Sequence, residues 1–166
     1  MPSIVACGGR KQAYDDFCTA LRTAKPDDFV ILLVDSEAPL GSTSWEHVRN
    51  RPGDGWIKPS GITDDHLQFM VQCMETWFLA DRQLLIDFFR NGFQVSALPQ
   101  NTQLEAIPKD DVQNGLIAAT RQCGRDRKYA KGRRSFRLLE HLDPATVREK
   151  CPSAQRFLAT LEAKLE

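Results

Sequence analysis

The longest apolar run of the chain covers residues 29–34, with the sequence Phe-Val-Ile-Leu-Leu-Val. It is too short for a stable lone helix and does not alternate, so it predicts a strand covered on both faces, as in parallel α/β sheets. Asp35 and Glu37 follow the run directly. Ligands of open α/β sheets bind outside the carboxyl ends of the strands. The alternation of a strand also puts both acids on one side, close enough to share a cation.

The pattern before this run predicts a strand and a helix. Residues 3–7 are a short apolar run ending at Gly8-Gly9, and apolar positions recur at helical spacing over residues 10–24. Together with the central strand they form a βαβ unit, whose crossover is expected to be right-handed. The glycine pair has two interpretations: it supplies the positive φ of a tight turn, or it presents backbone N–H groups to a phosphate.

The segment after the central strand lacks a hydrophobic period. Residues 38–63 are rich in proline and glycine and predict a loop, which is long for a passive connection. Trp45 and Trp56 are its large apolar residues. Either they fix an irregular loop to the core, or the loop is a lid that faces a substrate.

Apolar positions return at helical spacing over residues 63–90, beginning at Thr63, a suitable cap. This pattern predicts one long buried helix, or a helix broken near Asp81. Glu75 and Asp81 lie among the apolar positions. A carboxylate there lies at the solvent edge of the helix or, if buried, needs a cation or a hydrogen-bond donor.

The rest of the chain is predicted to be mostly helical. Alternation over residues 93–97 predicts one more strand, and residues 99–108 predict a loop. Helix starts are expected at Asp110, Ser135, Asp143-Pro144 and Cys151-Pro152. We therefore expect a single α/β domain over residues 1–166. It has a small, mainly parallel sheet flanked by helices, and a helical C-terminal part from about residue 109.

Composition narrows the class of protein. The chain has 166 residues, 42% of them apolar and 27% charged, as expected for one soluble globular domain. No apolar run is long enough to span a membrane and the start does not resemble a signal peptide, so we expect a cytoplasmic protein. The five cysteines are scattered and include no C-x-x-C pair, which predicts neither a disulfide framework nor a zinc site.

The charge is balanced overall but not locally. The chain has 22 basic residues (lysine and arginine) and 22 acidic ones (aspartate and glutamate), so its net charge does not indicate a partner. Residues 121–137, however, hold eight basic residues and one acid. Such a segment is either a solvated basic turn or a site for phosphate.

Four stretches of the sequence resemble a bacterial family known as domain of unknown function 4276. They are VACGGR at residues 5–10, LLVDSE at 32–37, QCMETWFLAD at 72–81 and YAKG at 129–132. The resemblance covers nearly the whole chain, and the third stretch is its most specific part. It implies a Toprim-like fold and a role in phage defence together with an ATPase partner.

Toprim enzymes hold Mg²⁺ with a Glu near their start and an Asp-x-Asp pair after a later strand. Asp35-x-Glu37 resembles that pair with one conservative change. The expected Glu-Gly-Gly turn and its strand would precede Val5, and the chain begins after them, so we expect a Toprim-like fold truncated at its N-terminus. Either Glu75 replaces the missing acid, or a partner or an upstream start supplies it, or catalysis is lost.

The first functional hypothesis is a nuclease, or nuclease subunit, that depends on Mg²⁺ or Mn²⁺. The predicted metal ligands are Asp35, Glu37, Glu75 and Asp81. The predicted catalytic residues are Asp35, Glu37, Glu75 and Lys131. The predicted phosphate-binding residues are Arg10, Lys128, Lys131, Arg133 and Arg134.

The second hypothesis is a non-catalytic module that docks an ATPase or another defence protein. Asp35 and Glu37 then only end a strand and bind neighbouring backbone N–H groups. Convergence of Asp35, Glu37 and Glu75 near Lys131 would favour the nuclease. The sequence leaves open whether DNA, RNA or a nucleotide is the substrate.

Overall fold

The sheet of the protein is small and parallel. The computed structural model describes residues 3–165, and within them β1 (Leu32–Asp35) pairs with β2 (Leu67–Met70) as a two-stranded parallel sheet. Leu32 lies opposite Leu67, and Asp35 lies opposite Met70. Both strands therefore end at the same edge, which confirms the predicted α/β class with a small parallel sheet.

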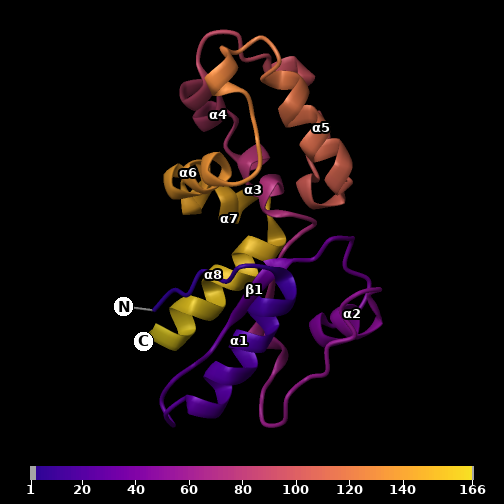
Figure 1. The fold of residues 1–166 in the computed structure, drawn as a ribbon, viewed down its shortest axis with the longest axis vertical. Helices are drawn as coiled ribbons and strands as arrows, with labels where there is room; N and C mark the ends of the chain where they lie inside the picture. The colour runs from indigo at the N-terminus through magenta and orange to yellow at the C-terminus, as the bar shows by residue number, and fades with distance from the viewer. Residues whose placement is uncertain (1–2, 166) are drawn as a thin grey trace.

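Helices make up most of the described residues (Figure 1). Near the sheet lie α1, α2 and α8, while α3 to α7 form the other half of the molecule. Short 3-10 turns cover Asp64–His66, Val95–Ala97, Leu104–Ala106 and Arg125–Arg127. The helices are α1 (Arg10–Thr23), α2 (Ser44–Asn50), α3 (Met74–Ala80), α4 (Arg82–Phe89), α5 (Lys109–Ala119), α6 (Arg133–His141), α7 (Pro144–Lys150) and α8 (Pro152–Leu165).

Each half has its own cluster of buried apolar side chains. One surrounds the sheet and includes Phe17 of α1 and Trp45 of α2. The other lies among α3 to α8 and includes Phe78 and Leu116. The last helix, α8, packs against both α7 and β2. It thus joins the helical half to the sheet, and the segment from β2 into α3 crosses between them as a second connection.

Several predicted elements are confirmed. The predicted helices at residues 10–24, from Asp110 and after Cys151 correspond to α1, α5 and α8. Asp143 caps α7, with its carboxylate accepting hydrogen bonds from the N–H groups of Ala145 and Thr146, and Pro144 is the first helical residue. No helix within residues 3–165 is long and apolar enough to cross a membrane.

The predicted strand at residues 3–7 is wrong. These residues have no regular structure, and Ile4 and Val5 are 90% and 73% exposed. A strand needs a neighbouring backbone for its N–H and C=O groups. Among the described residues, β1 and β2 pair only with each other, so an apolar composition by itself does not make residues 3–7 a strand.

The predicted long helix over residues 63–90 is also wrong in its first part. Thr63 caps only a 3-10 turn, and Leu67–Met70 form β2. Because β2 is covered on both faces, its sequence does not alternate clearly between apolar and polar residues. Its apolar positions therefore also fit the spacing of a helix. The predicted break at Asp81 is confirmed, since its Oδ1 accepts a hydrogen bond of 2.9 Å from the N–H of Leu84 and caps α4.

Three further differences concern local structure. The predicted strand at residues 93–97 is a 3-10 turn, and the N–H of Gln94 donates to Ala119 O of α5 instead of to a strand. Ser135 does not cap a helix, because α6 begins two residues earlier and buries it. The predicted loop at residues 38–63 contains α2, which begins with a capping box.

The two tryptophans fix the segment between β1 and β2 to the core. Trp45 and Trp56 are each 5% exposed. The indole of Trp45 donates to the carbonyl oxygen of Thr63 at 3.3 Å, and Trp56 stacks on Tyr14 of α1 with ring centroids 4.7 Å apart. These contacts support the anchoring interpretation of the segment over the lid.

Candidate functional site

Asp35 ends β1 at the edge where β2 also ends. Its Oδ1 accepts a hydrogen bond of 2.8 Å from the N–H of Met74, the first residue of α3. The chain passes from β2 through the buried Cys73 directly into this helix. The pairing of the two strands therefore fixes the carboxylate of Asp35 next to the start of α3.

Ser36 separates the two acids of the sequence motif and is more deeply buried than either of them. It is fully buried, its N–H donates to Met70 O at 3.1 Å, and its Oγ donates to Ala38 O at 2.7 Å. Nε2 of His47 meets its carbonyl oxygen at 2.8 Å. The strand alternation used in the sequence prediction does not extend to Glu37, because β1 ends at Asp35 and the backbone of Glu37 is left-handed.

Glu37 has a left-handed backbone, with φ of 66°. This conformation is rare for residues other than glycine. Its N–H donates to Gln72 O at 2.8 Å, and its carboxylate forms an ion pair with Nζ of Lys109, the first residue of α5. Burial alone would lower the pKa of Lys109, but the hydrogen bond and charge of Glu37, together with the charge of Asp35, raise it.

Glu75 is the buried acid of the site. It lies in the first turn of α3, is 2% exposed, and accepts a hydrogen bond of 2.6 Å from the hydroxyl of Tyr129. Oγ of Ser135 donates to the same hydroxyl at 3.4 Å. Burial and the bond to Glu75 raise the pKa of Tyr129, so this phenol stays a donor. The hydrogen bonds from Ser135 of α6 to Tyr129 and from Tyr129 to Glu75 hold the side chain of Glu75 in place.

The three acids interact electrostatically. Burial, followed by the charges of Glu75 and Glu37, raises the pKa of Asp35 to about 6, while the N–H of Met74 and the charge of Lys109 act in the opposite direction. Burial and the charge of Glu75 likewise raise the pKa of Cys73 to about 12, which keeps this thiol protonated. The structure thus brings Asp35, Glu37 and Glu75 together, with one lysine beside them.

The remaining predicted ligand and two of the predicted lysines have other positions. Asp81 is at the opposite end of α3 from Glu75 and caps α4. A helix of this length rises about 10 Å, so Asp81 is not beside the acids near the start of α3. Lys131 is exposed in the turn after Tyr129, and Lys128 is exposed just before it.

The predicted phosphate-binding arginines have different environments. The guanidinium of Arg10 forms two hydrogen bonds of 2.7 Å with Asp54 and also donates to the backbone carbonyl of Asp35. Arg51 donates to the same Asp54 at 3.0 Å. Arg10 is therefore a structural link between α1, β1 and the following segment. Arg134 donates to two backbone carbonyls, and Arg133 begins α6 with its side chain outside the described residues.

The donor set suits a hard cation. Within residues 3–165 no three His, Cys, Asp or Glu side chains are arranged as a complete metal-binding group. Mg²⁺ in proteins usually takes one or two carboxylates and completes its shell with water and phosphate oxygens. Asp35 and Glu75 supply two carboxylates, and each uses only one oxygen in hydrogen bonds to other described residues. The two side chains therefore have the donor chemistry that Mg²⁺ prefers, and Lys109 holds the third acid, Glu37, in an ion pair.

Sequence reasoning missed Lys109 and the role of Tyr129. Lys109 is 72 positions from Glu37, and nothing at the start of α5 indicated that it would meet an acid. Tyr129 belongs to the YAKG stretch that carried part of the family resemblance, so the sequence held a signal for it beside that for the basic Lys131.

We expect Tyr129→Phe to destabilise the protein by about 1–3 kcal/mol, because the buried Glu75 loses its donor. Urea unfolding at neutral pH measures this change. Tyr14→Phe is the matched control, since the hydroxyl of Tyr14 donates to Ile57 O at 2.7 Å in a solvent-exposed hydrogen bond, whose loss should cost less. Equal costs would contradict the role given to Tyr129.

The fold and the site define a class: a small α/β protein with a cluster of acids at the carboxyl ends of two parallel strands. The chain belongs to the family described as Domain of unknown function (DUF4276), whose sequence profile matches residues 6–162. This match confirms the family suggested by the sequence motifs. No curated protein and no solved structure matches the chain. The Toprim likeness and the role in phage defence stay predictions.

Proposed function

We propose that the protein is a nuclease, or the nuclease subunit of an assembly, that hydrolyses phosphodiesters with Mg²⁺ or Mn²⁺. One observation carries the proposal: Asp35 binds the N–H of Met74 at the start of α3, the buried Glu75 lies in the first turn of the same helix, and no lysine or arginine among the described residues forms a salt bridge with either acid. Neighbouring buried acids repel each other and are costly unless a cation or a proton neutralises them. A divalent cation would relieve that repulsion.

The residues divide into three roles under this proposal. Asp35 and Glu75 would hold the ion, which would polarise a phosphate and lower the pKa of an attacking water. Tyr129 and the N–H of Met74 orient the two carboxylates by hydrogen bonds. Lys109 adds a positive charge close to the acids, and Lys131 adds an exposed one after Tyr129. Positive charge near a scissile phosphate stabilises the transition state.

A second candidate is a non-catalytic module that docks an ATPase or another defence protein. It is favoured by the partners the acids already have: Met74 N–H for Asp35, Lys109 for Glu37 and Tyr129 for Glu75. Under this alternative the three acids tie β1, α3 and α5 together and bind no ion. The two candidates differ in whether the acids need a metal, which can be measured.

Cleavage of labelled single-stranded DNA, duplex DNA and RNA tests the proposal. We expect cleavage of at least one polymer with Mn²⁺ or Mg²⁺ and none with EDTA or with Ca²⁺ alone. The assay is run on the chain alone and, because the proposal includes a partner, together with any ATPase that a neighbouring gene encodes. Intact polymers under every condition, together with no Mn²⁺ binding by calorimetry, would leave the docking module as the function.

A further inference from the structure

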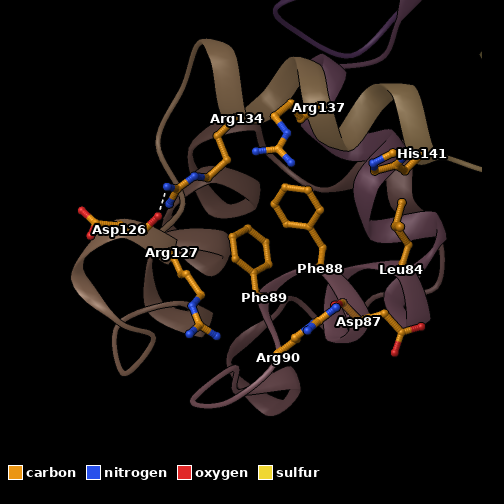
Figure 2. A pocket seen from close by; sticks show the side chains of 10 residues that line it. All are labelled: Leu84, Asp87, Phe88, Phe89, Arg90, Asp126, Arg127, Arg134, Arg137 and His141. Atoms are coloured by element: carbon orange, nitrogen blue, oxygen red, sulfur yellow. Dashed lines mark hydrogen bonds between the residues drawn. The ribbon is translucent and has the colours of Figure 1, made fainter.

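A groove lies in the helical half, away from the β1 edge. It has a volume of about 530 Å³ and is formed by α4, the turn at Arg125–Arg127 and α6 (Figure 2). Phe88 and Phe89 of α4 lie at its centre, and charged side chains surround them. Phe89 is fully buried, whereas Phe88 is half-buried and lines the groove.

The rim of the groove is rich in arginine. It carries Arg90, Arg127, Arg134 and Arg137, and His141 closes one end. No carboxylate of the described residues forms a salt bridge with any of the four guanidinium groups, although Asp87 and Asp126 also lie on the rim. Four positive charges against two negative ones leave an excess of two. The groove is therefore electrostatically suited to an anion.

One of these arginines is held in place. Arg134 donates to the backbone carbonyls of Asp126 and Lys128, which fixes it across the turn. Figure 2 shows its guanidinium at Asp126 and that of Arg137 above Phe88. All four cations are arginines, and none is a lysine. The planar guanidinium donates two parallel hydrogen bonds to a phosphate and also stacks on flat rings, which an ammonium group cannot do.

The combination of guanidinium groups and a phenyl ring favours anions that also carry a flat ring. Binding sites for single-stranded nucleic acid combine a positive groove for the backbone with aromatic rings on which bases stack. A free carboxylate ligand would use the charges but would gain nothing from the ring. We propose that this groove binds single-stranded nucleic acid, with phosphates on Arg90, Arg134 and Arg137 and a base against Phe88. The choice of nucleic acid as the ligand rests on the proposed nuclease function.

The groove and the acidic site share one helix. Arg134 lines the groove, and the next residue, Ser135, donates to Tyr129, which in turn holds Glu75. A strand in the groove would therefore lie across α6 from the acids. The groove would hold the polymer, and the acids at the strand ends would act on it.

Fluorescence anisotropy with a labelled 20-mer of thymidine or uridine tests the proposal. The measurements are made in EDTA at low salt, so that binding does not depend on a metal or on cleavage. Arg90→Gln/Arg137→Gln removes two exposed charges from the groove. We expect binding roughly tenfold weaker or more, and a less steep dependence on salt. Arg22→Gln/Arg49→Gln, which removes two exposed arginines from α1 and α2, should change binding less than about twofold.

Each result decides for or against the groove. Failure of the wild type to bind, equal losses in both double variants, or undiminished binding by the groove variant overturns the proposal. Displacement of the oligonucleotide by poly-glutamate at equal charge concentration also overturns it, because the groove would then accept an acidic protein segment. Binding without any cleavage leaves this proposal standing and counts only against the nuclease, so the two failures are distinguishable.

Discussion

Asp35→Asn is expected to lower metal-dependent cleavage by about a hundredfold or more, since a single metal ligand supports several kcal/mol of transition-state stabilisation. Asparagine has nearly the same shape, and its side-chain oxygen can still accept the hydrogen bond from Met74 N–H. The local fold is thus retained while the negative charge is removed. Glu75→Gln should have an effect of similar size, because its amide oxygen can still accept from Tyr129.

Asp81→Asn is the matched control for this experiment. The sequence predicted Asp81 as a metal ligand, whereas the structure places it at the cap of α4, at the other end of α3 from Glu75. Asparagine caps helices as well as aspartate does, so stability should hardly change. We expect cleavage within a few-fold of wild type. A loss as large as that of Asp35→Asn would return Asp81 to the metal site, and full activity of Asp35→Asn would remove the proposed ligand.

The second prediction concerns stability and pH. The pKa of Asp35 is raised from 3.8 to about 6 in the folded protein, so folding favours its protonated form. Its stabilising contribution is therefore complete below pH of about 4 and is lost as the pH rises through about 6. At neutral pH without divalent cations the ionised carboxylate then destabilises the fold by about 2–3 kcal/mol. Asp35→Asn should be more stable than wild type by that amount at pH 8 and by much less at pH 4.

Urea unfolding of both proteins at pH 4 and pH 8 measures the difference. Asp126→Asn, which removes an exposed acid, controls for the general loss of charge. Addition of Mg²⁺ at pH 8 should stabilise the wild type and leave Asp35→Asn unchanged, because a ligand stabilises only the protein that binds it. A gain for Asp35→Asn that is the same at both pH values would show that the three acids do not repel one another as described.

The strand and helix signals that succeeded are local ones. The run at residues 29–34 overlaps β1 at residues 32–34, and Asp143-Pro144 starts α7 because an N-cap and a proline act within one turn of chain. The signals that failed depended on neighbours. Residues 3–7 have the composition of a strand but no partner, and β2 has a helical pattern because both of its faces are covered.

The site shows the same division. Asp35 and Glu37 were identified from their position after an apolar run, and Glu75 from being an acid among apolar positions. Their convergence depends on the parallel register of β1 and β2, which sets Asp35 opposite Met70 and hence beside the start of α3. Asp81 follows the same kind of pattern as Glu75, yet a helix separates it from the acids.

The sequence by itself determined the α/β class, the family, the acids after the central strand and the basic segment at residues 121–137, because each is encoded in neighbouring residues. Only the tertiary structure decided that Lys109 and Tyr129 hold two of the acids, and that Arg90 of α4 joins Arg134 and Arg137 of α6 around Phe88. These contacts join segments that are far apart along the chain, and the local pattern of a segment does not indicate which distant segment it will pack against.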